Sequence, residues 1–141
     1  GVLACHGGHT GGYALYVQDR RLRFVHNLVG TTFHRVAAEV ELPAGSVLAR
    51  LTFTPTGRTA GDIELWYDDV PVGGGHLPSL TPVTYGTEPF CVGAQPGTPI
   101  CEELVGRAEP PAGVLQHVVI EVAGTAARDA AAEERVAMSR Q

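Results

Sequence analysis

The residues with the clearest chemical potential lie near the start of the chain, in residues 5–12, CHGGHTGG. One interpretation is a metal site, because the thiol of Cys5 and the imidazoles of His6 and His9 are groups that zinc accepts as ligands. A structural zinc site needs four closely placed ligands, and the remaining histidines form no second cluster in the sequence. We therefore assign no metal site to this stretch.

The same stretch has two further interpretations. The tripeptide from His6 to Gly8 is similar to the oxyanion loop HGGG of lipases, which serves a serine in a G-x-S-x-G turn. None of the three serines of the chain lies in such a motif. The other interpretation is geometric, because paired glycines allow positive φ angles and a tight or bulged connection between strands. We favour the geometric interpretation.

The other polar candidates have ordinary structural explanations. Asp68 and Asp69 offer oxygen ligands for calcium, but adjacent aspartates between two strands are typical of a turn. Glu102 and Glu103 fall in an expected loop, where we expect both to be solvated. Trp66 is expected either to pack in a second buried layer or to contact a sugar ring or another domain. We assign no catalytic, cofactor-binding or metal-binding residue.

The charged residues exclude several classes of function. All ten basic residues are arginine, and the chain contains no lysine. A Walker P-loop and Schiff-base chemistry both require a lysine amine, so neither is available. The net charge of −5 argues against a nucleic-acid partner, because no basic surface is available to bind phosphates.

The cysteine count and the hydrophobic pattern bear on the compartment. Three cysteines are an odd number, which is not typical of a secreted disulfide scaffold. Cys91 and Cys101 could pair and leave Cys5 free, although three reduced thiols are the expectation. No apolar run is long enough to span a membrane and no signal peptide opens the chain, so we expect a cytoplasmic protein with no membrane partner.

The elements that position these residues are expected to be strands, since apolar and polar residues alternate along most of the chain. Turn sequences rich in glycine, proline and aspartate separate the runs. Residues 73–89 and 95–111 are expected to be loops. The expected strands are 13–18, 22–28, 35–42, 47–54, 63–68, 70–72, 90–93 and 114–122.

About eight or nine short strands in a chain of 141 residues predict one all-β domain, a sandwich or a barrel. The 18 glycines and 10 prolines agree with a turn-rich fold of this kind. We place the β domain at residues 1–124. Residues 125–141 are rich in alanine, glutamate and arginine, and are expected to form a short C-terminal helix or a flexible tail.

Residues 1–17, GVLACHGGHTGGYALYV, resemble the C-terminal domain of bacterial arylsulfatases, where the pattern is roughly G-V-L-x-A-x-G-G-x-x-G-G-Y-x-L-Y-V. Further segments follow in the family's order, namely LRFVHNL (22–28), LPAG (42–45), LWYDD (65–69), FCVG (90–93) and GTP (97–99). The resemblance covers about residues 1–122. Asp69 replaces a glycine of the family's hairpin, and Gln95 stands near its usual aspartate.

This resemblance implies an antiparallel two-sheet β-sandwich similar to the concanavalin A-like jelly roll, attached to an enzyme that hydrolyses sulfate esters. The nucleophile of sulfatases is a formylglycine made from the first residue of a C/S-x-P-x-R motif. None of the three cysteines here begins that motif. The formylglycine and the calcium of the family would belong to a separate catalytic domain, so we expect no cofactor in this chain.

We therefore expect an accessory C-terminal domain of an arylsulfatase-like sulfuric ester hydrolase, whose partner is the catalytic domain. The family domain usually begins one strand earlier, so an open sheet edge and self-association are also expected. The alternative is a free-standing carbohydrate-binding, lectin-like module. Such a module should present aromatic rings, such as Trp66, Tyr67 or Tyr85, on an open concave sheet face, whereas a docking domain should expose a continuous apolar patch.

Overall fold

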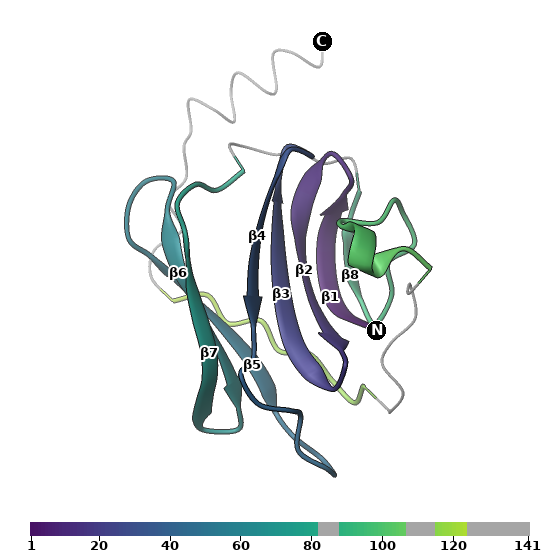
Figure 1. Cartoon of the computed structure of the whole chain (residues 1–141), viewed down its shortest axis with the longest axis vertical. Coiled ribbons are helices and arrows are strands. Elements are labelled where there is room, and N and C mark those ends of the chain that lie inside the picture. Colours follow the sequence, from purple (N-terminus) through teal and green to yellow (C-terminus); the bar gives the residue numbers. More distant parts are fainter. Residues whose placement is uncertain (82–87, 107–114, 124–141) are drawn as a thin grey trace.

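The computed structural model describes residues 1–81, 88–106 and 115–123, which form two antiparallel sheets (Figure 1). The five-stranded sheet has the order β4-β3-β2-β1-β8, and the three-stranded sheet has the order β5-β6-β7. This arrangement confirms the expected all-β, two-sheet class. The strands are β1 (Val2–Gly8), β2 (Gly11–Gln18), β3 (Arg21–Leu28), β4 (Thr32–Ala37), β5 (Ala49–Pro55), β6 (Gly61–Tyr67), β7 (Val70–Leu77) and β8 (Phe90–Val92).

The glycines of CHGGHTGG shape the first hairpin, in which β1 pairs with β2 around His9 and Thr10. Gly7 and Gly12 face each other across the two strands, with φ angles of +88° and +139°. A Cβ atom on Gly7 would collide with the carbonyl oxygen of Gly11, and one on Gly12 with that of His6. Since only glycine fits these positions, the geometric interpretation of the motif is confirmed.

The two faces of the five-stranded sheet are buried by different parts of the chain. On the inner face, Phe24 and Val36 pack against Ile63 and Leu65 of the three-stranded sheet. The outer face is covered by residues after β8, including a short 3₁₀ helix, η1 (Glu102–Leu104). The buried cluster on this outer face consists of Val2, Cys5, Ala14, Tyr16, Val25, Ile100, Cys101 and Leu104.

The three-stranded sheet lies at the β4 end of the larger sheet (Figure 1). Directly after β4, the N–H of Ala38 donates to Leu22 O at 2.8 Å and that of Glu39 donates to Val72 O at 2.7 Å. The chain therefore turns from β3 towards β7, which ends β4 at Ala37, before the expected boundary at residue 42. Strands β1 and β8 lie at the far end of the larger sheet, away from the smaller one (Figure 1).

Two expectations about strands were wrong. Gly73 to Gly75 were expected in a loop but belong to β7, paired with β6. A Cβ on Gly73 would collide with the backbone of Ala37, and one on Gly75 would press on Val36, so glycine lets β7 lie close to β4. The second wrong expectation is the strand at 114–122. Its described part has no strand structure, because neither sheet pairs with it, and Val119 and Ile120 are exposed.

The remaining expectations concern the tail and the membrane. Residue 114 and the proposed helix or tail at 125–141 lie outside the described residues. In the ranges that the structure does describe, no helix is long and apolar enough to cross a membrane.

Glu103 was expected to be solvated, but it is bound to Arg35 of β4. The guanidinium donates two hydrogen bonds to the carboxylate, at 2.8 and 3.2 Å, and holds the pKa of Glu103 at about 2. Because this folded-state pKa lies below the ordinary value, the pair stabilises the fold above about pH 4.5, and the contribution is lost as pH falls towards 2. We expect Glu103→Gln to lower the free energy of unfolding by about 1 kcal/mol at neutral pH.

Urea unfolding of Glu103→Gln and the unmodified chain, at neutral pH and at about pH 2.5, measures this contribution. The difference between the two proteins should shrink at the lower pH. Glu102→Gln is the matched control, because Glu102 is adjacent and exposed and has no ion pair among the described residues. Equal losses in both variants would contradict the assignment of the pair.

Candidate functional site

The three candidate ligands of the CHGGHTGG stretch point to different places. Cys5 belongs to the core on the outer face, whereas the alternation along β1 places His6 on the inner face. His9 lies in the hairpin turn, where its Nδ1 is 3.1 Å from Thr98 Oγ1. Within the described ranges, no three His, Cys, Asp or Glu side chains are grouped so that they could hold a metal ion.

The acidic pair of the β6–β7 hairpin forms a turn, as the sequence predicted. Asp68 has a φ of +52°, and its carboxylate accepts a hydrogen bond from the N–H of Leu48 at 3.0 Å. This bond ties the turn to the segment that leads into β5. The side chain of Asp68 therefore has a structural partner.

The aromatic residues suggested for sugar binding do not share one face among the described residues. Tyr67 is buried, and its hydroxyl accepts the N–H of Leu22 at 2.9 Å. Trp66 points to the opposite face of the three-stranded sheet, where the guanidinium of Arg50 lies 4.7 Å from its ring centroid. Tyr85 lies outside the described residues.

A row of rings that the sequence analysis missed crosses the inner face of the five-stranded sheet. Each member is the direct cross-strand neighbour of the next. The rings of His6 and Tyr13 meet edge to face at 5.9 Å, and those of His26 and His34 are stacked at 6.2 Å. From one edge of the sheet to the other, the row is Phe90, His6, Tyr13, His26 and His34.

Burial decreases along this row from His26 towards β8. His26 is only 5% exposed, its Nε2 lies 2.9 Å from Thr81 Oγ1, and burial lowers its pKa. Tyr13 and Phe90, in contrast, are 37% and 39% exposed. This change follows from the position of the three-stranded sheet at the β4 end. The β8-end surface, which we define as His6, Tyr13, Phe90 and Val92, is therefore accessible.

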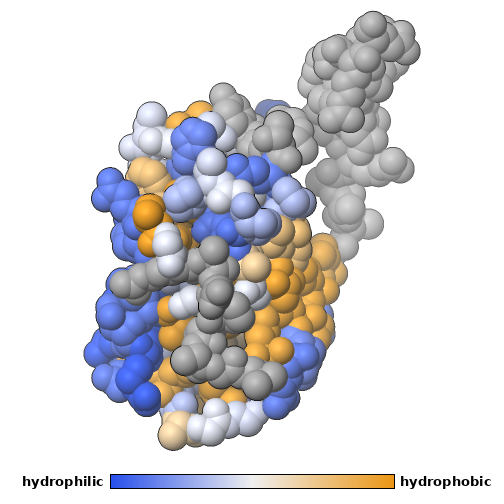
Figure 2. Space-filling view, turned by 90° about the vertical axis from the view of Figure 1, so that its right-hand side faces the viewer, coloured by the Kyte–Doolittle hydropathy of each residue, from blue (hydrophilic) through white to orange (hydrophobic). Residues whose placement is uncertain are grey.

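Part of the side that contains β8 is hydrophobic (Figure 2). Figure 2 faces this side and shows hydrophobic residues gathered over one part of it, beside hydrophilic residues. Val92 is 46% exposed, and residues 115–123 begin beside β8, with Leu115 next to Gly93. That segment exposes Val118, Val119, Ile120 and Val122.

No family model, curated protein or solved structure matches this chain. The β8-end surface must therefore be interpreted from its own chemistry. It combines apolar side chains with aromatic rings and an imidazole at one edge of a sheet. Such a surface can pack against another protein or stack on a sugar ring.

Proposed function

We propose that this chain is a non-catalytic accessory β-sandwich that packs, through the β8-end surface, against the catalytic domain of an arylsulfatase-like protein. The observation that carries the proposal is the exposure of the apolar side chains of Phe90 and Val92, on a side of the molecule where hydrophobic residues gather (Figure 2). Exposed apolar patches of this kind are typical of protein–protein contacts. The resemblance of residues 1–122 to the C-terminal domain of arylsulfatases, with its concanavalin A-like sandwich, supplies the identity of the partner.

The strand pairing supports the same proposal. β8 lies at the edge of the five-stranded sheet, and among the described strands it pairs only with β1. An edge strand that carries the exposed side chains of Phe90 and Val92 suits a partner that adds backbone hydrogen bonds and buries apolar area together. The burial of apolar area contributes about 25 cal/mol per Å².

The proposal is tested with the reading frame that encodes this chain and with binding measurements. We expect a sulfatase catalytic domain with a C/S-x-P-x-R motif in the same polypeptide or its neighbouring genes. The isolated chain should not hydrolyse an aryl sulfate, and it should bind that domain. Val92→Asp should weaken binding about tenfold or more, since it buries a charge in an apolar contact.

Val105→Asp is the matched control, because Val105 is also exposed but lies after η1, in the segment that covers the outer face. Equal weakening by both substitutions would reject the β8-end surface as the contact. A reading frame with no sulfatase sequence, or binding that survives Val92→Asp, would overturn the proposal.

A second candidate function, carbohydrate binding, is favoured by the exposed rings of Tyr13 and Phe90 beside His6. Aromatic faces can stack on the apolar faces of sugars, and an imidazole can hydrogen-bond their hydroxyl groups. If the chain binds carbohydrate, a polysaccharide in the gel should slow its migration in affinity electrophoresis. Tyr13→Ala should remove this effect. Absence of retardation by every polysaccharide would reject it and leave the docking proposal unaffected.

A further inference from the structure

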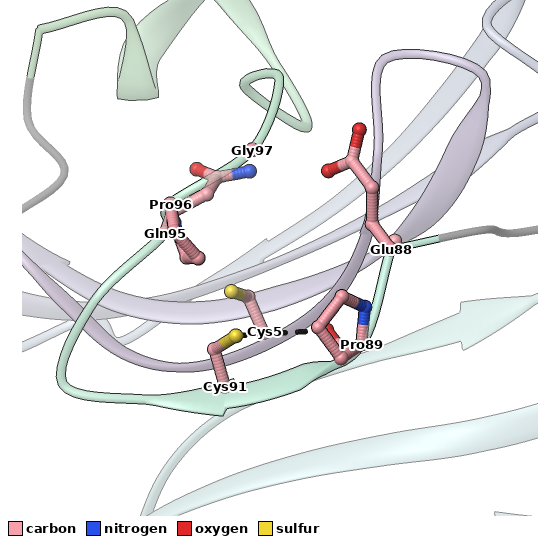
Figure 3. A pocket seen from close by; sticks show the side chains of 8 residues that line it. Cys5, Glu88, Pro89, Cys91, Gln95, Pro96 and Gly97 are labelled. Atoms are coloured by element: carbon pink, nitrogen blue, oxygen red, sulfur yellow. Dashed lines mark hydrogen bonds between the residues drawn. The ribbon is translucent and has the colours of Figure 1, made fainter.

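The outer face of the same two strands contains a second feature, a cavity of about 210 Å³ next to β1 and β8 (Figure 3). Two thiols line it, one from each strand. Cys5 is buried at 2% exposure, and Cys91 is partly exposed. Glu88 and Gln95 are the polar side chains of the wall, and Gly7, Pro89, Pro96 and Gly97 complete it.

The register of the sheet makes these two cysteines direct cross-strand neighbours. The N–H of Gly93 donates to Leu3 O at 2.8 Å, so Leu3 and Gly93 are a hydrogen-bonded pair. Hydrogen-bonded pairs recur every second residue in an antiparallel ladder. Two residues along from the Leu3–Gly93 pair, Cys5 and Cys91 therefore form the next hydrogen-bonded pair. Their Cα atoms are then about 5.5 Å apart, within the range that a disulfide bridges.

Both side chains point into the cavity (Figure 3). The thiol of Cys5 donates to Ala94 O at 3.4 Å, and that of Cys91 donates to Pro89 O at 3.7 Å. Thiols are weak donors, so these contacts do not hold the sulfur atoms firmly. Burial, with the nearby Cys91 as a smaller cause, raises the pKa of Cys5 to about 11. Cys91 is therefore the thiol that a reagent reaches first.

We propose that Cys5 and Cys91 form a reversible intramolecular disulfide that fixes β8 to β1. The oxidant is a small aliphatic disulfide of the oxidised glutathione type. The Cys91 thiolate attacks one sulfur of the oxidant, its S–S bond breaks, and the first reduced thiol leaves. Cys5 then loses its proton and attacks Cys91 Sγ in the mixed disulfide, which releases the second thiol. The protein loses two electrons and two protons, and the oxidant gains both.

The third cysteine does not compete for this bond. Cys101 belongs to the buried outer-face core beside η1, and it does not line the cavity. Burial raises its pKa to about 12, above that of Cys5. The pairing of Cys91 with Cys101, which the sequence alone left open, is therefore not the one that the register favours.

To test this proposal, the full chain is treated with oxidised glutathione, and the remaining free thiols are alkylated. The disulfides are then mapped by proteolysis and mass spectrometry. We expect a mass loss of about 2 units and a linked peptide pair that contains Cys5 and Cys91. Because the bond closes a long loop, the melting temperature should rise by roughly 5 to 10 °C and should return after dithiothreitol treatment.

Variants separate this bond from other oxidation products. Cys91→Ser should prevent both the linked peptide and the shift in melting temperature, whereas Cys101→Ala should preserve both. Cys5→Ala should stop the reaction at a glutathione adduct on Cys91. A linked pair that contains Cys101, or a persistent glutathione adduct in the unmodified chain, would overturn the proposal. Peptide mapping of the unmodified chain decides the question even if a variant does not fold.

Discussion

Gly12→Ala is expected to lower the free energy of unfolding by about 3 to 5 kcal/mol. Gly12 has a φ of +139°, which L-residues rarely adopt, and a new Cβ atom would collide with the carbonyl oxygen of His6. That carbonyl is part of the backbone of the paired strand, so it cannot move without breaking the β1–β2 ladder. Urea unfolding followed by circular dichroism measures the loss.

Gly57→Ala provides the matched control for this substitution. Gly57 lies between β5 and β6, has no positive φ, and has no atom within 4 Å of an added Cβ. Its replacement by alanine should change stability by less than about 1 kcal/mol. If Gly12→Ala were as mild as Gly57→Ala, the hairpin would not have the close strand approach described above.

The sequence predicted the β2–β3 hairpin well because its information is local. The turn residues and the alternation specify β2 and β3 to within two residues at each end. The same alternation implies that Cys5 and His6 lie on opposite faces. Pairing around the turn at His9 and Thr10 also brings His6 opposite Tyr13, so this half of the ring row was accessible to sequence reasoning.

The features that were missed depend on contacts between distant segments. Gly73 to Gly75 have no side chains that show alternation, and only the proximity of β4 explains why a strand needs glycine there. Residues 115–123 alternate like a strand, but alternation does not specify a pairing partner, and no described strand pairs with them. The pairing of Cys5 with Cys91 requires the register of β8 on β1, and the intervening chain does not specify that register.

Asn27→Leu is expected to destabilise the fold by about 3 to 5 kcal/mol, since it removes several buried hydrogen bonds at once. Asn27 is fully buried and is the only asparagine in the chain. Its Nδ2 donates to the carbonyl oxygens of Gly8, His9 and Ile100, at 3.1, 3.0 and 2.9 Å. Its Oδ1 accepts the N–H of Gly30 at 2.7 Å.

These bonds join three segments, namely the β1–β2 turn, the β3–β4 turn and the strand-free segment before η1. Leucine has a similar size but leaves the N–H of Gly30 and the three carbonyl groups without this partner. Asn27→Asp is a second, nearly isosteric variant. Its carboxylate still accepts from Gly30 but cannot donate to the carbonyl oxygens, so it should be at least as destabilising at neutral pH.

Thr52→Val is the matched control for Asn27, because Thr52 donates a single exposed hydrogen bond to Glu64 at 3.3 Å. Its loss should cost less than about 1 kcal/mol. Hydrogen exchange of the amides of Gly30 and Thr31 should accelerate in Asn27→Leu even under conditions where the protein stays folded, since the β3–β4 turn loses its side-chain anchor. Unchanged exchange together with a loss of stability no larger than that of Thr52→Val would show that the hydrogen bonds of Asn27 are not what holds these three segments together.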